Sequence, residues 1–244
     1  MEKLKIAKLI SMSGFCSRRD AEKFILEGRV KINGETITNV AERFYQDTKI
    51  EIDGKLLNNS PTPLLYLFYK PVECITSKSD PSGRKTIFDI LPKTLPHLIS
   101  VGRLDFYSEG ALLLTNNGSL ATILMSPKNH VPRTYKVKVY GNLPSDLKQK
   151  LEQGIEIEGI QYQPIQTSII SDKDKKHHIL KLTLYEGKNR EIRNICKFFN
   201  LKIDKLVRIE YAGISISGMK PTELKKLDNK VIDNIFKNYS KNID

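Results

Sequence analysis

Residues 101–118, VGRLDFYSEGALLLTNNG, set a single aspartate between an arginine and an apolar segment. The run 111–114 is continuously apolar, which predicts a buried strand, and the following Asn-Asn-Gly is a turn sequence that ends it. Asp105 is therefore expected at the edge of a sheet, where a carboxylate faces a cleft. Arg103 lies two residues earlier, but an Arg-x-Asp triplet alone is weak evidence, because most such pairs are exposed and contribute little.

The rest of the chain predicts more strands than helices. Strands are expected at 64–69, 111–115, 134–140, 155–160, 179–185 and 205–216. Helices are expected at 119–125, 144–153 and 189–199. Strands with few long helical crossovers favour an α+β fold that contains a central, largely antiparallel mixed sheet.

Residues 1–58 predict a separate small unit. Residues 3–12 have helical periodicity and end at Gly14, and Ser17 is a suitable N-cap for a second helix. Asn33-Gly34 then joins two short strands and is a strong hairpin signal. Two short helices and a basic hairpin resemble the alpha-L RNA-binding module first seen in a small-subunit ribosomal protein. The alternative is a solvated helix pair that caps the other domain.

Residues 59–63 contain two prolines and no periodicity, and they are the expected linker to a second domain, 64–244. The 244 residues include 40 Lys and Arg against 28 Asp and Glu, for a formal charge of +12. This excess indicates a polyanionic partner, with nucleic acid first, unless the lysines form an ordinary solvated surface. No apolar leader or membrane span is visible, so a soluble cytoplasmic protein without membrane contact is expected.

The sequence contains no cofactor or metal signature. Cys16, Cys74 and Cys196 are far apart, so neither a disulfide framework nor a zinc site is indicated, and a reducing compartment fits. A phosphate loop, a dinucleotide fingerprint and a His-Glu-x-x-His motif are all missing from the sequence. An enzyme built from this chain would have to use side chains alone.

Two segments offer side chains for chemistry. Tyr135 shares the apolar face of its predicted strand, so it is either a core tyrosine or a residue at the edge of a site. On the helix predicted at 189–199, Arg190, Arg193 and Lys197 fall within a narrow arc. This arc is either a solvated basic face or a source of one arginine that pairs with a buried carboxylate and holds it ionised.

Several motifs together resemble a known family. They are KPVECITSKSDPSGRKTIFDILP, VGRLDFYSEGALLLTNNG, RTYKVKVYG, LYEGKNREIRNI and KLVRIEYAGISISGMKPTELKKL. Their order and spacing are similar to those of the RsuA/RluB family of ribosomal RNA pseudouridine synthases, and the resemblance covers nearly the whole chain. The SDPSGRKTIFD segment is more similar to the RluB-type branch, which acts on large-subunit ribosomal RNA.

The resemblance implies that residues 64–244 form a pseudouridine synthase catalytic domain that needs no cofactor. It implies that Asp105 is the catalytic aspartate, Tyr135 the active-site tyrosine and Arg193 the basic partner of the aspartate. Asp105 would either attack the ribose or abstract its 2′ proton. Since the target base must be flipped out of folded RNA, Arg103 would fill the vacated stack or hold a neighbouring phosphate.

The expected partner is ribosomal RNA, or a ribosome assembly intermediate, bound by a monomer. The residues expected to contact RNA are basic and are spread over both domains: Arg18, Arg19, Arg29, Lys31, Lys70, Arg103, Lys136, Lys188 and Arg190. The alternative function is a non-catalytic RNA-binding ribosome-assembly factor that uses the same basic surface. A metal-dependent nuclease is disfavoured, because the sequence shows no clustered carboxylates.

Overall fold

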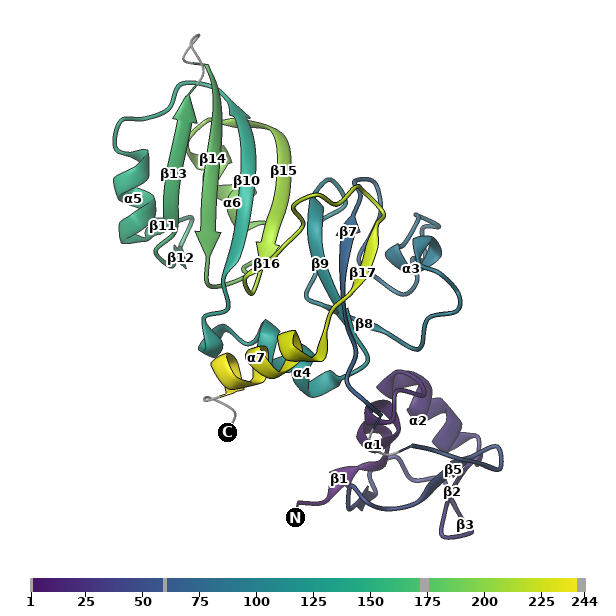
Figure 1. The fold of residues 1–244 in the computed structure, drawn as a ribbon. Helices are drawn as coiled ribbons and strands as arrows, with labels where there is room; N and C mark the ends of the chain where they lie inside the picture. The colour runs from purple at the N-terminus through teal and green to yellow at the C-terminus, as the bar shows by residue number, and fades with distance from the viewer. Residues whose placement is uncertain (1, 59–60, 172–175, 241–244) are drawn as a thin grey trace.

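The computed structural model describes residues 2–58, 61–171 and 176–240 (Figure 1). Within residues 2–58, two short helices pack against a small antiparallel sheet of order β3-β2-β5-β6. The elements of this unit are β1 (Leu4–Lys5), α1 (Ile6–Met12), α2 (Arg18–Leu26), β2 (Val30–Ile32), β3 (Glu35–Ile37), β4 (Arg43–Phe44), β5 (Ile50–Ile52) and β6 (Lys55–Leu56). The unit has its own apolar core, formed by buried isoleucines from both helices and the sheet.

Local chemistry explains this N-terminal unit. The Ser17 hydroxyl accepts a hydrogen bond from the Asp20 backbone N–H at 3.1 Å, so the predicted N-cap is present. Asn33 and Gly34 have φ values of 51° and 89°, which suit the predicted tight hairpin between β2 and β3. The first helix starts at Ile6, later than predicted, because residues 4 and 5 pair with β4. Residues 59 and 60 of the expected linker lie outside the described residues.

Among the described residues after 60, nine strands form one mixed sheet of order β13-β14-β10-β15-β9-β7-β17. β16 pairs with β15 at one side, and β8 pairs with β9. The pairs are antiparallel except for β15 and β9, which run parallel over the pairs Val207↔Glu109 and Arg208↔Gly110. The expected α+β fold with a largely antiparallel mixed sheet is therefore confirmed.

The strands of this sheet are β7 (Leu65–Lys70), β8 (Ile99–Val101), β9 (Glu109–Thr115), β10 (Arg133–Tyr140), β13 (Gln166–Ser171), β14 (His177–Leu184), β15 (Lys202–Tyr211), β16 (Ile214–Ser215) and β17 (Leu224–Lys226). A separate hairpin consists of β11 (Ile155–Ile157) and β12 (Ile160–Tyr162). The helices are α3 (Ile87–Ile90), α4 (Gly118–Met125), the 3₁₀ turn η1 (Pro127–Asn129), α5 (Leu147–Gln153), α6 (Glu191–Phe198) and α7 (Asn229–Tyr239).

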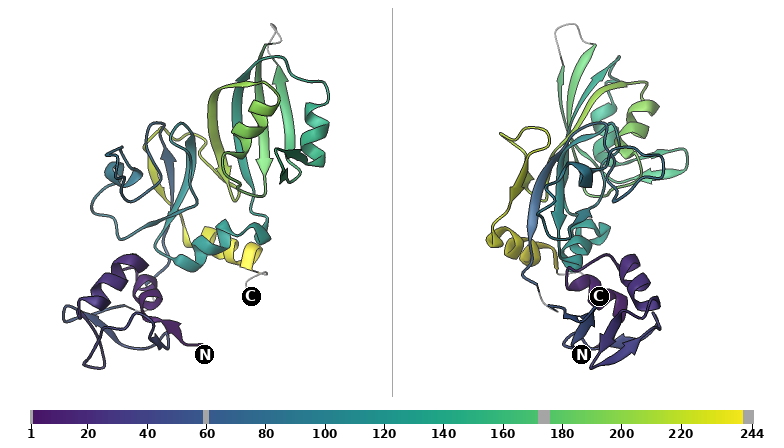
Figure 2. Two further views of the ribbon diagram at one scale, coloured as in Figure 1. Left: turned by 180° about the vertical axis from the view of Figure 1, so that it is seen from behind. Right: turned by 90° about the vertical axis from the view of Figure 1, so that its right-hand side faces the viewer.

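Helices cover the two faces of the sheet unevenly. α5 and α6 pack on one face of β13-β14-β10-β15, where Leu147, Leu151, Ile192 and Ile195 join the core (Figures 1 and 2). α4 and α7 pack together on the β7–β9 part of the other face. α3 lies on the same side as α6, against the opposite face of β7 and β9. This arrangement leaves a gap in side-chain packing between α6 and the α3 region, at the middle of the sheet.

Two predicted strands are wrong in the same way. Residues 205–216 were expected as one strand, but Ala212 and Gly213 have φ values of 53° and 79° and form the turn between β15 and β16. Residues 155–160 were also expected as one strand, but Glu158 and Gly159 turn the chain between β11 and β12. None of the helices in the described ranges is long and apolar enough to cross a membrane.

Candidate active site

Asp105 lies in the loop between β8 and β9, on the side of the sheet that α6 occupies. The loop leaves β8 through Gly102, whose φ is +73°, and closes with a hydrogen bond from the Ser108 backbone N–H to the Asp105 carbonyl at 3.0 Å. The Thr76 hydroxyl donates to the Leu104 carbonyl at 3.0 Å, and the Leu104 N–H donates back to it at 3.2 Å. These bonds fix the backbone on both sides of Asp105.

Lys70 holds the backbone of the same loop through hydrogen bonds, and this buried position differs from its predicted role. Its side chain is fully buried, and Nζ donates to the carbonyl oxygens of Pro71 at 2.9 Å, Asp105 at 3.1 Å and Ser108 at 2.9 Å. Burial lowers the pKa of this ammonium group. Lys70 was expected to bind RNA, but its ammonium is covered and its hydrogen bonds go to the backbone, so that prediction is wrong.

Arg193 reaches Asp105 from α6, which packs on the β13-β14-β10-β15 part of the sheet. Arg193 Nε donates to Asp105 Oδ2 at 3.2 Å, and Nη2 donates to the Tyr107 carbonyl at 3.1 Å and to Ser108 Oγ at 3.0 Å. Arg190 adds a longer ion pair, 3.8 Å from Nη1 to Oδ2. The Asp105 side chain is 39% exposed and that of Arg193 is 18% exposed, so the carboxylate is accessible while the guanidinium is shielded.

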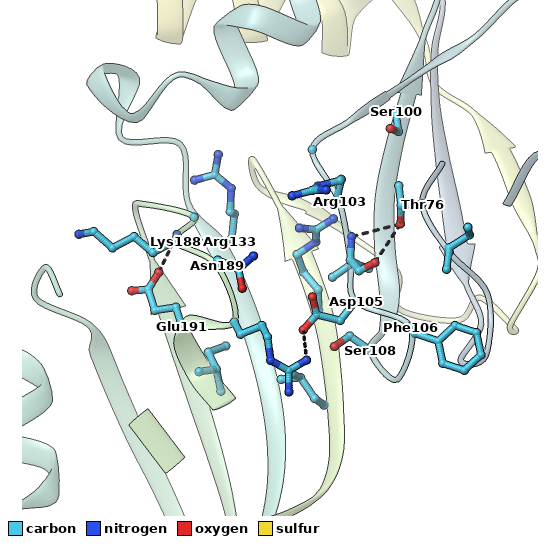
Figure 3. Close-up of a pocket in the computed structure, with 18 of the residues that line it drawn as sticks. Thr76, Ser100, Arg103, Asp105, Phe106, Ser108, Arg133, Lys188, Asn189 and Glu191 are labelled. Atoms are coloured by element: carbon cyan, nitrogen blue, oxygen red, sulfur yellow. Dashed lines mark hydrogen bonds and ion pairs between the residues drawn. The ribbon is translucent and has the colours of Figure 1, made fainter. Parts of the chain in front are cut away.

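Asp105 faces a pocket of about 910 Å³. Tyr135, at the start of β10, lines the pocket and packs against the cores on both sides of it. In Figure 3, Arg103, Asp105 and Ser108 lie along one wall and Lys188, Asn189 and Glu191 face them from the other. The pocket therefore brings together six residues predicted from the sequence: Arg103, Asp105, Tyr135, Lys188, Arg190 and Arg193.

The loop that carries Lys188 and Arg190 depends on two buried glutamates that sequence reasoning missed. Lys188 Nζ pairs with the Glu186 carboxylate and donates to the Gln161 carbonyl at 2.6 Å. Glu191 Oε2 accepts a hydrogen bond from the Lys188 N–H at 3.1 Å. Burial, together with the nearby Glu186 charge, raises the pKa of Glu191 to about 7. The alternation of acidic and basic residues in EGKNRE was a signal that could have indicated this cluster.

Two buried arginines that line the pocket were also missed. Arg208 Nε donates to the Ala111 carbonyl at 2.6 Å, and its guanidinium lies 4.7 Å from the centre of the Tyr211 ring. Arg133 lies 5.1 Å from the same ring and donates to the Leu124 carbonyl at 3.0 Å. Both side chains are more than nine-tenths buried. Their guanidinium groups lie at the same pocket as the Asp105 side chain, and the Lys70 ammonium bonds to the backbone of the Asp105 loop.

The other predicted RNA-binding residues lie away from this pocket. Arg18, Arg19 and Lys31 are exposed on the N-terminal unit. Arg29 is there too, but its guanidinium pairs with Asp53 at 2.6 Å and with Glu27 at 3.0 Å, so a phosphate would have to compete with carboxylates. Lys136 points to the opposite face of the sheet from Tyr135, because neighbouring residues on a strand alternate.

Comparison with known proteins identifies the family. The RNA pseudouridylate synthase family matches residues 65–198, which is more than half of the chain. The chain belongs to this family. The S4 domain family matches residues 4–44 of the same synthase, in agreement with the predicted N-terminal module. No group of three or more His, Cys, Asp or Glu side chains suited to a metal ion occurs in residues 2–58, 61–171 or 176–240 of the synthase.

Similar proteins match the synthase over nearly its whole length. An uncharacterized RNA pseudouridine synthase of Rickettsia felis is 45% identical over 230 residues, covering 94% of this chain and 99% of the relative. The Ribosomal large subunit pseudouridine synthase B of Bacillus subtilis is 36% identical over 228 residues, covering 93% and 92%. A crystal structure of a pseudouridylate synthase has a TM-score of 0.67 at 24% identity and covers 95% of this chain and 99% of the other, which supports the fold.

Proposed function

We propose that this synthase converts uridine to pseudouridine in large-subunit ribosomal RNA, with Asp105 as the catalytic carboxylate and without a cofactor. The observation that carries the proposal is the pairing of the accessible Asp105 carboxylate with the Arg193 guanidinium at 3.2 Å, inside a pocket that Tyr135 also lines. Large-subunit RNA is favoured because the relative from Bacillus subtilis that is named for this substrate matches 93% of the chain.

The reaction needs only acid, base or nucleophile chemistry. The bond from ribose C1′ to uracil N1 breaks, the base turns within the pocket, and a new bond forms from C1′ to C5. The proton on C5 is lost and N1 gains one, so the reaction is an isomerisation that consumes neither oxidant nor reductant. A carboxylate can begin it by attack on C1′ or by removal of the 2′ proton, and we assign this step to Asp105.

The surrounding residues divide the remaining tasks. The Arg193 Nε–H donates to Asp105, so it is not available to bind substrate. Arg193 therefore orients the Asp105 carboxylate and offsets its negative charge. Tyr135 offers a ring for the uracil to stack on. Arg103, Lys188 and Arg190 line the rim of the pocket and suit the phosphates of a flipped nucleotide and its neighbours. Exposed Arg18 and Arg19 extend the RNA contact to the S4 domain.

The test is site mapping of pseudouridine in ribosomal RNA. Total ribosomal RNA from a strain that lacks the gene is incubated with wild-type protein or with the Asp105→Asn variant, and pseudouridine is then mapped at nucleotide resolution. Wild-type protein should add pseudouridine to large-subunit RNA, and the variant should be slower by about a thousandfold or more, because an amide can act neither as nucleophile nor as base.

A matched variant separates chemistry from folding. Asp233→Asn changes an exposed aspartate of α7 and should leave activity unchanged. Circular dichroism should show that both variants fold. The proposal is wrong if wild-type protein adds no pseudouridine to ribosomal RNA or if Asp105→Asn keeps full activity. Modification confined to small-subunit RNA contradicts the substrate assignment alone.

A further inference from the structure

The face of the sheet opposite the Asp105 pocket carries a group of lysines on its inner strands. We call it the lysine face and define it as Lys136, Lys138, Lys181 and Lys205. Cross-strand pairing places Lys136 directly opposite Lys181 of β14, and Lys138 directly opposite Lys205 of β15. Only Val137 separates Lys136 from Lys138 along β10, so these two lysines share one face, and the four side chains form a continuous row across three neighbouring strands.

This arrangement places like charges side by side. Directly opposed like charges destabilise a sheet, because their side chains are close. Lys205 is neutralised by the Glu109 carboxylate at 2.6 Å. By contrast, within the described part of the chain, the side chains of Lys136, Lys138 and Lys181 make neither an ion pair nor a hydrogen bond, and all are exposed. The face therefore concentrates positive charge for which these residues supply no counterion.

Protection of the sheet edge does not account for these lysines. Lysine on an edge strand discourages pairing with another chain. The edge strand here is β13, and its residues on this face are Gln166, Ser168 and Ile170, as the pairs Ser168↔Lys181 and Ile170↔Ile179 show. Lys136, Lys138 and Lys181 lie instead on β10 and β14, which pair with a neighbouring strand on both sides at these residues.

The lysine face borders a groove of about 880 Å³. Lys136, Lys138 and Lys205 line the groove, together with Tyr69 and the exposed Ile170. Tyr135, Leu206 and Arg208 alternate with these residues along β10 and β15 and line the Asp105 pocket on the other side. The groove and the pocket therefore lie on opposite faces of the sheet and are separate binding surfaces.

We propose that the lysine face binds the phosphodiester backbone of the RNA substrate outside the active-site pocket. The inference rests on the proposed RNA substrate and extends it to a second surface. Lysine ammonium groups on flexible stems suit the evenly charged backbone of RNA, and phosphates would supply the missing counterions. The face would increase affinity for a large folded RNA without reading its sequence, because backbone contacts position a nucleic acid and do not specify it.

The experiment compares two triple variants of the full-length protein that lose the same charge. Lys136→Gln, Lys138→Gln and Lys181→Gln together remove the unpaired part of the lysine face. Lys226→Gln, Lys230→Gln and Lys237→Gln together remove three exposed lysines from β17 and α7 as a matched control. Binding to an in vitro transcript of large-subunit ribosomal RNA, and to a short hairpin fragment of it, is measured over a series of salt concentrations.

The lysine-face variant should bind the long transcript about tenfold more weakly at low salt. Its plot of log affinity against log salt should be shallower than that of wild type by about 2, since each lost phosphate contact removes somewhat less than one unit. The control triple should resemble wild type, and the short hairpin should bind all three proteins alike. These readouts report binding, so they stand whether or not Asp105 proves catalytic.

Two outcomes overturn the inference. Equal affinity and equal salt dependence for the two triple variants on the long transcript would show that the lysine face does not touch RNA. Unchanged RNA binding combined with lost co-sedimentation on large-subunit assembly particles would assign the face to an acidic protein instead. Circular dichroism of the lysine-face variant should match wild type, since the substituted side chains are exposed.

Discussion

Gly110→Ala tests whether the short contact between β9 and β15 holds the two parts of the sheet together. These strands pair in parallel over Val207↔Glu109 and Arg208↔Gly110. Gly110 has a φ of +109°, and a Cβ placed on it would lie 2.2 Å from the Arg208 carbonyl oxygen and 2.9 Å from the Arg208 backbone N and C. These are backbone atoms, so the clash can be relieved only if the strands separate.

The size of the effect follows from two costs. A side chain at this positive φ costs about 1–2 kcal/mol in backbone strain. Overpacking against a backbone that must shift by roughly an ångström costs about 1–3 kcal/mol more. The sum, about 2–5 kcal/mol, is a large part of the stability of an ordinary domain. For a domain of this size it corresponds to a fall in Tm of roughly 5–15 °C.

Gly213→Ala is the matched control. Gly213 also has a positive φ, +79°, but no atom lies within 4 Å of its added Cβ, so only the strain remains. Because the chain has no tryptophan, far-UV circular dichroism is the suitable probe of thermal unfolding. The melting temperature of Gly110→Ala should be clearly lower than that of Gly213→Ala. Gly110→Ala should also lower kcat, since Asp105 and Arg193 lie on opposite sides of the joint between β9 and β15. Equal melting temperatures would refute the reasoning.

Two further predictions concern buried charges. Lys70→Met should lower the free energy of unfolding by about 3 kcal/mol, because it removes the ammonium group that donates hydrogen bonds to the loop carbonyls. Lys136→Met, at an exposed lysine, should change the free energy of unfolding little. Chemical denaturation of the two variants and wild type measures the difference. Glu191→Gln should stabilise the protein above pH 7. Between about pH 4.5 and 7 the Glu191 carboxyl stays protonated in the folded state but is ionised in the unfolded state, because burial raises its pKa. As the pH rises across this range, the stability of wild type therefore falls, by at most about 3 kcal/mol. The glutamine side chain of the variant does not titrate, so the variant lacks this fall. Parallel denaturation curves of wild type and Glu191→Gln from pH 4 to 8 would contradict the burial argument.

Local patterns in the sequence predicted the features that depend on neighbouring residues. The Ser17 cap and the Asn33-Gly34 hairpin are set by bonds and dihedral angles within a few residues, and both are present. The strand predicted at 205–216 failed because apolar residues continue on both sides of its turn. Ala212 and Gly213 interrupt this run without a proline, an Asn-Gly pair or a polar cluster, so the pattern contained little evidence of a reversal.

The site depended on contacts that no local pattern contains. Asp105 and Arg193 are 88 residues apart in the chain, and the family resemblance, not periodicity, indicated their pairing. Lys70 was misassigned because a lysine is rarely buried, and the carbonyls that accept from it belong to a loop 35 residues or more away and to its own neighbour. Glu186 and Glu191 were missed for a related reason, since acidic residues beside basic ones are usually solvated.

The contacts across the joint between β9 and β15 give the Asp105–Arg193 pair a structural role as well. Few backbone hydrogen bonds join β9 to β15, and side chains from the later part of the chain complete the joint. Arg208 reaches the Ala111 carbonyl, Lys205 pairs with Glu109, and Arg193 binds Asp105, Tyr107 and Ser108. Loss of Arg193 would therefore disturb both the charge next to Asp105 and the width of the pocket. Lys205 and Glu109 join the same two strands on the opposite face of the sheet, so substitution of either would change the width of the pocket without changing the charge next to Asp105. Comparing variants at Arg193 with variants at Lys205 therefore separates electrostatic from geometric control of Asp105.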